Sequence, residues 1–87
     1  MKTIVFDETC VGWTKYTDLN NAYLGLQKDH FNDRLLAKGY VYLNEIYEAL
    51  GVKWNPEDEN ICYLSENGPI DIQYLPYGGS KYLVMIR

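Results

Sequence analysis

Residues 31–51, FNDRLLAKGYVYLNEIYEALG, contain the end of one predicted helix and the start of the next. Apolar residues recur on both sides of Gly39 at the spacing of an amphipathic helix. Extended in both directions, this pattern predicts a long helix over residues 18–38 and a short helix over residues 43–50. Glycine adopts the left-handed backbone that ends helices, so Gly39 and Gly51 are the expected caps. The predicted apolar stripe of the long helix comprises Leu19, Ala22, Tyr23, Leu26, Phe31, Leu35 and Leu36.

The residues between the two helices predict a structural corner rather than a chemical site. Tyr40 and Tyr42 are expected to fill the corner, because a tyrosine ring covers a large apolar area. Asn44 and Glu45 fall in the first turn of the short helix. There they can satisfy free backbone amides and complement the helix dipole.

Outside the helices the sequence predicts strands, since the hydrophobic period changes to two after Trp54. A strand is expected near the N-terminus at residues 2–6, with a further piece at residues 10–13. The three C-terminal strands are expected at residues 61–64, 70–75 and 81–86. An Asn-Gly pair and a Gly-Gly pair lie between them, which favours a three-stranded antiparallel meander. The predicted class is α+β, with a helical hairpin packed on one face of the sheet.

Composition and charge narrow the function classes. The chain has 87 residues, which predicts a single domain spanning residues 1–87. It is 47% hydrophobic and 15% aromatic, too apolar for a disordered chain. The net charge is −4 and the eight basic residues are scattered, which argues against direct nucleic-acid binding. With neither a membrane-spanning apolar run nor a signal peptide, the expected location is the cytoplasm of a host cell.

No group of side chains predicts a metal or cofactor site. His30 and Asp33 share one helix face beside Asp29, but a site needs three or four ligands. The acids at residues 57–59 and Glu66 lack the alternation and central glycine of a calcium loop. We therefore expect neither a metal nor an organic cofactor.

The sequence also contains no catalytic motif. Glu45 and Glu48 are spaced to share a helix face, but no nucleophile accompanies them. Cys10 and Cys62 form no CxxC pair and have one histidine to share, so we expect two reduced thiols that pack as small apolar groups. The expectation is that the chain is not an enzyme.

A set of loop residues is the candidate partner-binding site. Trp54 and Tyr77 lie in loops that no apolar stripe claims, and Glu57, Asp58 and Glu59 lie in the loop after Trp54. Aromatic anchors carry much of the energy of protein interfaces, and acidic groups select a basic partner. The alternative is that both rings cover the ends of a thin core.

The segment NAYLGLQKDHFNDRLLAKGYVYLNEIYEALGVKW resembles an uncharacterised family of phage and prophage proteins of Gram-positive bacteria. The resemblance covers roughly residues 13–54. The positions that carry it are Asp18, Leu19, Asn21, Ala22, Gly39, Tyr40, Leu43, Asn44, Glu45, Tyr47, Leu50 and Gly51. Members are usually longer, so the chain resembles their C-terminal domain. The resemblance implies a phage or mobile-element origin and no activity or functional residue.

Three function classes remain open from the sequence. The first is a small acidic protein that binds a host protein surface, as anti-CRISPR and other anti-defence inhibitors do. The second is a phage virion or assembly accessory, which would be a symmetric oligomer and leaves a homodimer open. The third is a small enzyme with an unrecognised site. The expected partner in the first two classes is a host or phage protein.

Overall fold

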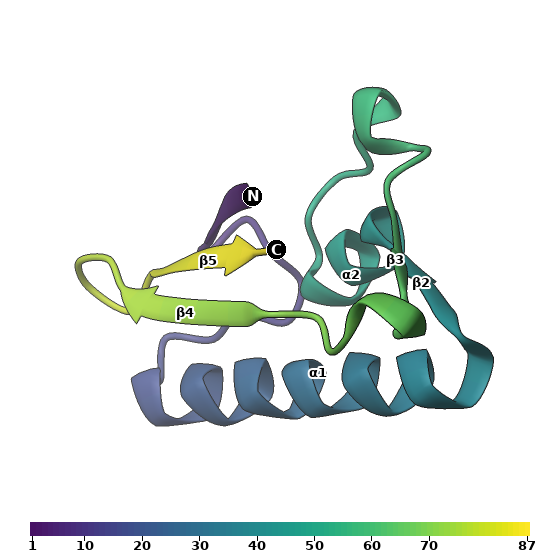
Figure 1. Ribbon diagram of the computed structural model, residues 1–87. Helices are drawn as coiled ribbons and strands as arrows, with labels where there is room; N and C mark the ends of the chain where they lie inside the picture. The colour runs from purple at the N-terminus through teal and green to yellow at the C-terminus, as the bar shows by residue number, and fades with distance from the viewer.

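The computed structural model describes residues 1–87 and confirms the α+β class (Figure 1). A strand comes first, two helices follow, and the remaining strands are antiparallel. The elements in chain order are β1 (Lys2–Phe6), α1 (Thr17–Lys38), β2 (Tyr40–Tyr42), α2 (Leu43–Leu50), the 3₁₀ turn η1 (Pro56–Asp58), β3 (Cys62–Leu64), the 3₁₀ turn η2 (Ser65–Asn67), β4 (Ile72–Pro76) and β5 (Tyr82–Ile86).

Both helices end where the glycine pattern predicts. Gly39 has φ 88° and its N–H donates to the Leu35 carbonyl at 2.7 Å. Gly51 ends α2 with φ 78°. Both values lie in the left-handed region, which only glycine adopts without strain. The predictions for the two helix ends are therefore confirmed.

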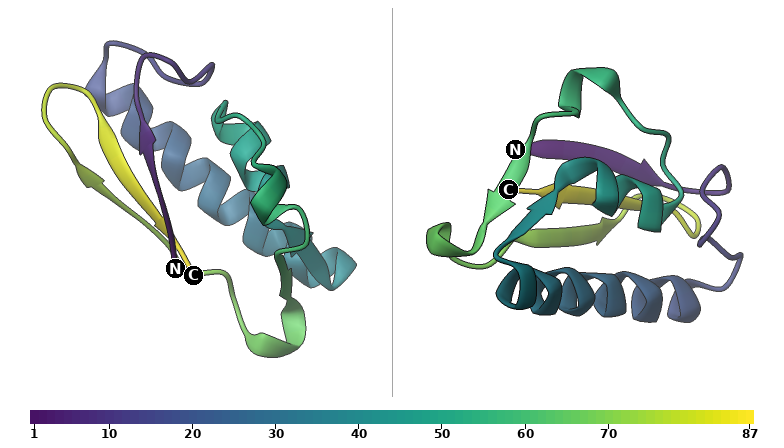
Figure 2. Two further views of the ribbon diagram at one scale, coloured as in Figure 1. Left: turned by 90° about the horizontal axis from the view of Figure 1, so that it is seen from above. Right: turned by 90° about the vertical axis from the view of Figure 1, so that its right-hand side faces the viewer.

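The main sheet consists of β1, β5 and β4, with β5 in the centre and both pairings antiparallel. Ile4 lies opposite Val84, and Tyr74 lies opposite Val84 on the other side. The two helices lie on the same side of this sheet (Figure 2). The first strand of the chain is thus brought beside the last one, which closes the small core.

The predicted C-terminal meander is wrong, because β3 does not join β4. Instead β3 pairs with β2 in a separate two-stranded ribbon, with Tyr42 opposite Cys62. The sequence predicts no strand at β2, because three residues between two helices also fit a turn. The Asn-Gly pair makes no hairpin either. Asn67 ends η2, and Gly68, with φ 88° and ψ −176°, leads the chain away toward β4.

Residues 10–13 do not continue the first strand. They form turns in which the Cys10 N–H donates to the Asp7 carbonyl at 2.9 Å and the Trp13 N–H donates to the Cys10 carbonyl at 3.1 Å. These hydrogen bonds lie within turns and not between paired strands. The turns reverse the direction of the chain before α1.

The apolar stripe predicted for α1 is only partly correct. Phe31 and Leu35 are buried, but Leu19, Leu26 and Leu36 are exposed by 57%, 66% and 79%. The buried face of α1 comprises Asn20, Leu24, Phe31 and Leu35. Leucines occur on both sides of this helix, so their spacing alone does not select the face that meets the sheet.

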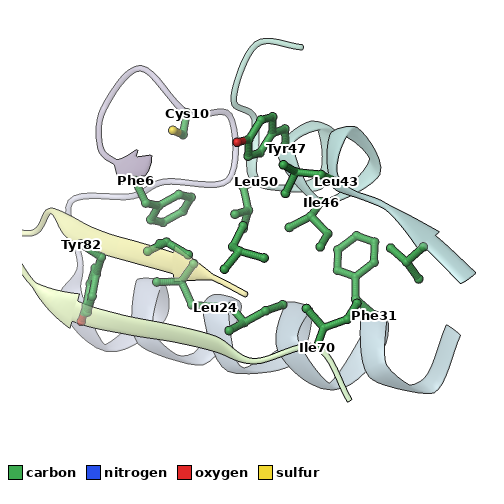
Figure 3. Packing of buried hydrophobic residues seen from close by; sticks show 14 of the residues in the cluster. Phe6, Cys10, Leu24, Phe31, Leu43, Ile46, Tyr47, Leu50, Ile70 and Tyr82 are labelled. Carbon is green, nitrogen blue, oxygen red and sulfur yellow. The ribbon is translucent and has the colours of Figure 1, made fainter. Parts of the chain in front are cut away.

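The core lies between the helices and the sheet (Figure 3). Phe6 of β1 stacks on the Tyr23 ring of α1, with 5.8 Å between ring centroids. From α2, Leu43, Ile46 and Leu50 point into the same space (Figure 3). Burial of these apolar side chains supplies most of the free energy that favours folding.

Asparagine side chains join the layers where strands are absent. In three places one side-chain amide pairs with both the backbone N–H and the backbone C=O of a single distant residue, at distances from 2.7 to 3.4 Å. The pairs are Asn20 with Thr14, Asn32 with Ile70, and Asn44 with Asn55. These amides supply the hydrogen bonds that partly buried loop backbone would otherwise lack.

Candidate functional site

The loop after α2 holds Trp54 between two fixed points. At one end, a Cβ atom on Gly51 would lie 2.3 Å from the backbone nitrogen of Val11. These two segments of the chain therefore lie too close together for any residue other than glycine at position 51. At the other end, the Asn44 side chain pairs with the backbone of Asn55 at 3.3 and 3.4 Å. Trp54 between them is 52% exposed. Its position is set by its neighbours in the chain rather than by burial of its ring.

A surface depression of about 330 Å³ lies beside the Trp54 ring. Tyr42, which lines it, packs edge to face against Tyr40 with 5.8 Å between ring centroids. These tyrosines are 43% and 44% exposed. We name the following set the Trp54 surface: Tyr40, Tyr42, Glu45, Trp54, Glu59 and Asn60.

The sequence predicts that Tyr40 and Tyr42 fill the corner between the helices, whereas both rings lie on the surface. Their rings are outside because β2 alternates, with Val41 fully buried between them. Alternation over residues 40–42 was the available signal. It is weak, since three residues also fit a helix-to-helix turn.

Glu45 joins the Trp54 surface to the helices. One carboxylate oxygen accepts from the Tyr42 N–H at 2.8 Å, which confirms the expected role at the start of α2. The other oxygen forms an ion pair with Arg34 of α1 at 2.7 Å. Asn44 differs from the expectation, because it is buried and binds the loop at Asn55 instead.

Asp58 does not lie on the acidic surface as expected, since its side chain is buried. It is 2% exposed, lies 2.7 Å from the Lys2 ammonium and accepts from the Tyr47 hydroxyl at 3.1 Å. The hydrogen bond from Lys2 lowers the Asp58 pKa, and the hydrogen bond from Tyr47 lowers it further against the effect of burial. Burial, with help from Asp58, raises the Tyr47 pKa to about 12. Asp58 thus ties η1 to β1, while Glu57 and Glu59 remain exposed.

Tyr77 is exposed but belongs to another part of the molecule. It lies in the turn between β4 and β5, where its N–H donates to the Lys81 carbonyl at 2.9 Å, and it is 56% exposed. This turn and η1 lie at opposite ends of the molecule (Figures 1 and 2). The structure therefore does not bring Tyr77 together with Trp54 and the acids.

His30 and the two cysteines are the remaining candidate residues from the sequence. His30 packs edge to face on Phe31, with 5.0 Å between ring centroids. Cys10 is buried and Cys62 is half-buried on β3, and neither forms a disulfide. No three side chains of histidine, cysteine, aspartate or glutamate come together as a metal site would require. No helix is both long and apolar enough to cross a membrane.

Comparison with known proteins gives a family but no activity. No curated protein and no solved structure shows significant similarity to the chain. A family model, described as a family of unknown function (DUF6353), matches residues 1–84. Because the match spans nearly the whole sequence, the chain belongs to the DUF6353 family.

Proposed function

We propose that the chain is a non-catalytic protein-binding domain of phage or mobile-element origin that covers a basic patch on a host protein through the Trp54 surface. Small anti-defence inhibitors such as anti-CRISPR proteins act in this way. The observation that carries the proposal is a half-exposed tryptophan, held on a fixed loop beside two half-exposed tyrosines and exposed acids. The proposed origin rests on the resemblance carried by residues 13–54.

The fixed loop favours binding because it reduces the entropy lost on association. Trp54 lies between Gly51, which packs against Val11, and the Asn44–Asn55 pair. The loop should therefore lose little conformational entropy when a partner binds. Tryptophan and tyrosine are the residues most enriched among binding hot spots. The surface thus has both the residue types and the rigidity of an interface anchor.

The charges favour a basic partner. Glu59 is exposed and lines the depression beside Trp54, Glu57 is exposed in the same loop, and the chain as a whole carries −4. Such groups steer a basic surface inward and speed association more than they add affinity. Among the groups near this surface, the carboxylate with the lowered pKa is Asp58, which is already paired with Lys2. That pairing supports a structural role for Asp58 over acid–base chemistry.

The proposal is tested by affinity capture from host lysate with three forms of the chain, followed by titration of the purified partner. The variant is Trp54→Ala. The matched control is Tyr16→Ala, which removes a 57% exposed aromatic ring at the start of α1. We expect the wild type and the control to bind one partner equally, and Trp54→Ala to weaken binding about 30-fold, as for a hot spot of about 2 kcal/mol. Equal binding by all three forms would contradict the proposal.

A further inference from the structure

One face of the main sheet is covered by no part of the chain. Side chains alternate along each strand, so one set of positions faces the helices and the other faces outward. Both helices lie on the inner side (Figure 2). We name the six outward positions the open sheet face: Thr3, Val5, Gln73, Leu75, Leu83 and Met85.

The middle of the open sheet face is an apolar row. The strand register places Leu83 of the central strand between Val5 on β1 and Leu75 on β4. Leu75 is 54% exposed and Val5 is 38% exposed. Met85 lies in the next row, between Thr3 and Gln73. This row of exposed apolar side chains is the apolar surface that a partner on this face would bury.

The open sheet face carries no charged side chain at any of its six positions, whereas the whole chain is acidic. At one end of the sheet, Lys81 lies 3.9 Å from Glu8. Two chains of charge −4 can therefore meet on this face without the repulsion that their acidic surfaces would impose.

We propose that a second copy of this chain covers the open sheet face, forming a symmetric dimer in which two three-stranded sheets pack face to face. Such packing interdigitates apolar rows across sheets that lie about 10 Å apart. A neutral, apolar face is complementary to itself, as a two-fold interface requires. A basic partner finds no acidic complement among the six positions, so the observations favour self-association here.

The area of the open sheet face determines the expected affinity of the dimer. Three strands about 4.8 Å apart, each of about five residues rising about 3.3 Å, give a face roughly 15 Å on a side. A stable interface buries about 800 Å² on each partner, which is several times larger. The dimer should therefore be weak and reversible, with a dissociation constant in the micromolar to millimolar range.

Sedimentation velocity from about 10 µM to about 1 mM protein tests the proposal. We expect the average mass of the wild type to rise with concentration and that of Leu75→Lys to stay at one chain. The matched control is Leu36→Lys, which makes the same change at a 79% exposed leucine on α1 and should dimerise as the wild type does. Thermal melts confirm that both variants fold. A second variant, Val5→Lys, keeps the test valid if Leu75→Lys unfolds.

Salt provides an independent measurement. Because the face is neutral, raising NaCl from about 50 mM to about 500 mM should leave dimerisation unchanged or strengthen it. A wild type that stays monomeric at about 1 mM would overturn the proposal. The open sheet face would then not be covered by a second copy of the chain. The same conclusion would follow if Leu36→Lys prevented self-association while Leu75→Lys did not.

Discussion

Asn20 shows how one polar residue can hold a small fold together. It is completely buried, and its amide pairs with both backbone groups of Thr14 and also donates to the Ser80 carbonyl at 3.2 Å. The loop before α1 and the turn before β5 thus meet on one side chain. Replacing it by an apolar group leaves several backbone groups without partners, each of which costs free energy to bury.

We predict that Asn20→Ala lowers the free energy of unfolding by about 2 to 4 kcal/mol, because it leaves buried backbone groups unpaired. The control is Asn21→Ala at the neighbouring exposed position, expected to change stability by about 0.5 kcal/mol or less. Urea unfolding measured by circular dichroism gives both values. Equal effects of the two substitutions would show that the buried amide contributes little.

The Asp58 carboxylate gives a prediction about acid stability. Its pKa is lowered in the folded chain, chiefly by the hydrogen bond from Lys2. The stabilisation is therefore present above the pKa of about 3.9 of an unfolded aspartate and is lost as the pH falls through the folded pKa. Asp58→Asn should make stability at neutral pH lower and its decline below about pH 4 shallower. Urea midpoints measured at several pH values test this, and an unchanged acid slope would contradict it.

The ends of the helices can be predicted from the sequence, whereas the pairing of distant strands cannot. Gly39 and Gly51 end their helices through backbone angles that depend on one residue, so the sequence predicts them directly. The partner of β3 depends on β2, a strand of three residues, and the sequence pattern does not distinguish β2 from a turn. Asp58 was expected in solvent for a similar reason, since its partner Lys2 is far away in the chain.

The junction of α2 with the loop before α1 yields a prediction in which strain and close approach can be separated. Gly51 and Gly78 have nearly equal φ angles of 78° and 76°. A Cβ atom at Gly78 would meet nothing within 4 Å, whereas one at Gly51 would lie 2.3 Å from the Val11 nitrogen. Gly78→Ala should cost about 1 to 2 kcal/mol from left-handed strain alone. Gly51→Ala should cost clearly more, about 3 kcal/mol or above, because the loop must also move.

Thermal and urea unfolding of the two alanine variants provide the comparison. Gly51→Ala should also shift the tryptophan fluorescence, because Trp13 and Trp54 lie in the two segments that meet at Gly51. If both alanines cost the same, the close approach at Val11 does not constrain the junction.

The two proposed binding surfaces lie on different sides of the molecule. The Trp54 surface is built from β2, α2 and the loop that follows, which lie with the helices, whereas the open sheet face points away from them (Figure 2). The sequence predicts one binding site that combines Trp54, Tyr77 and the acids, but the structure separates Tyr77 from the others. Trp54 and the exposed acids belong to the helix side, and Tyr77 belongs to the turn at the end of the sheet.

This separation predicts bivalent binding, because a dimer through the sheets leaves both Trp54 surfaces free. On a densely immobilised partner, a dimer can engage two molecules at once, and its dissociation should be about tenfold slower or more. Leu75→Lys should remove that slowing without changing the affinity for the partner in solution. Trp54→Ala should weaken binding in both formats, since each copy uses its own anchor. Biosensor dissociation rates at low and high partner density, beside solution titration, give the comparison. If Leu75→Lys weakens solution binding as much as Trp54→Ala does, the sheet face itself contacts the partner and the division into two surfaces is wrong.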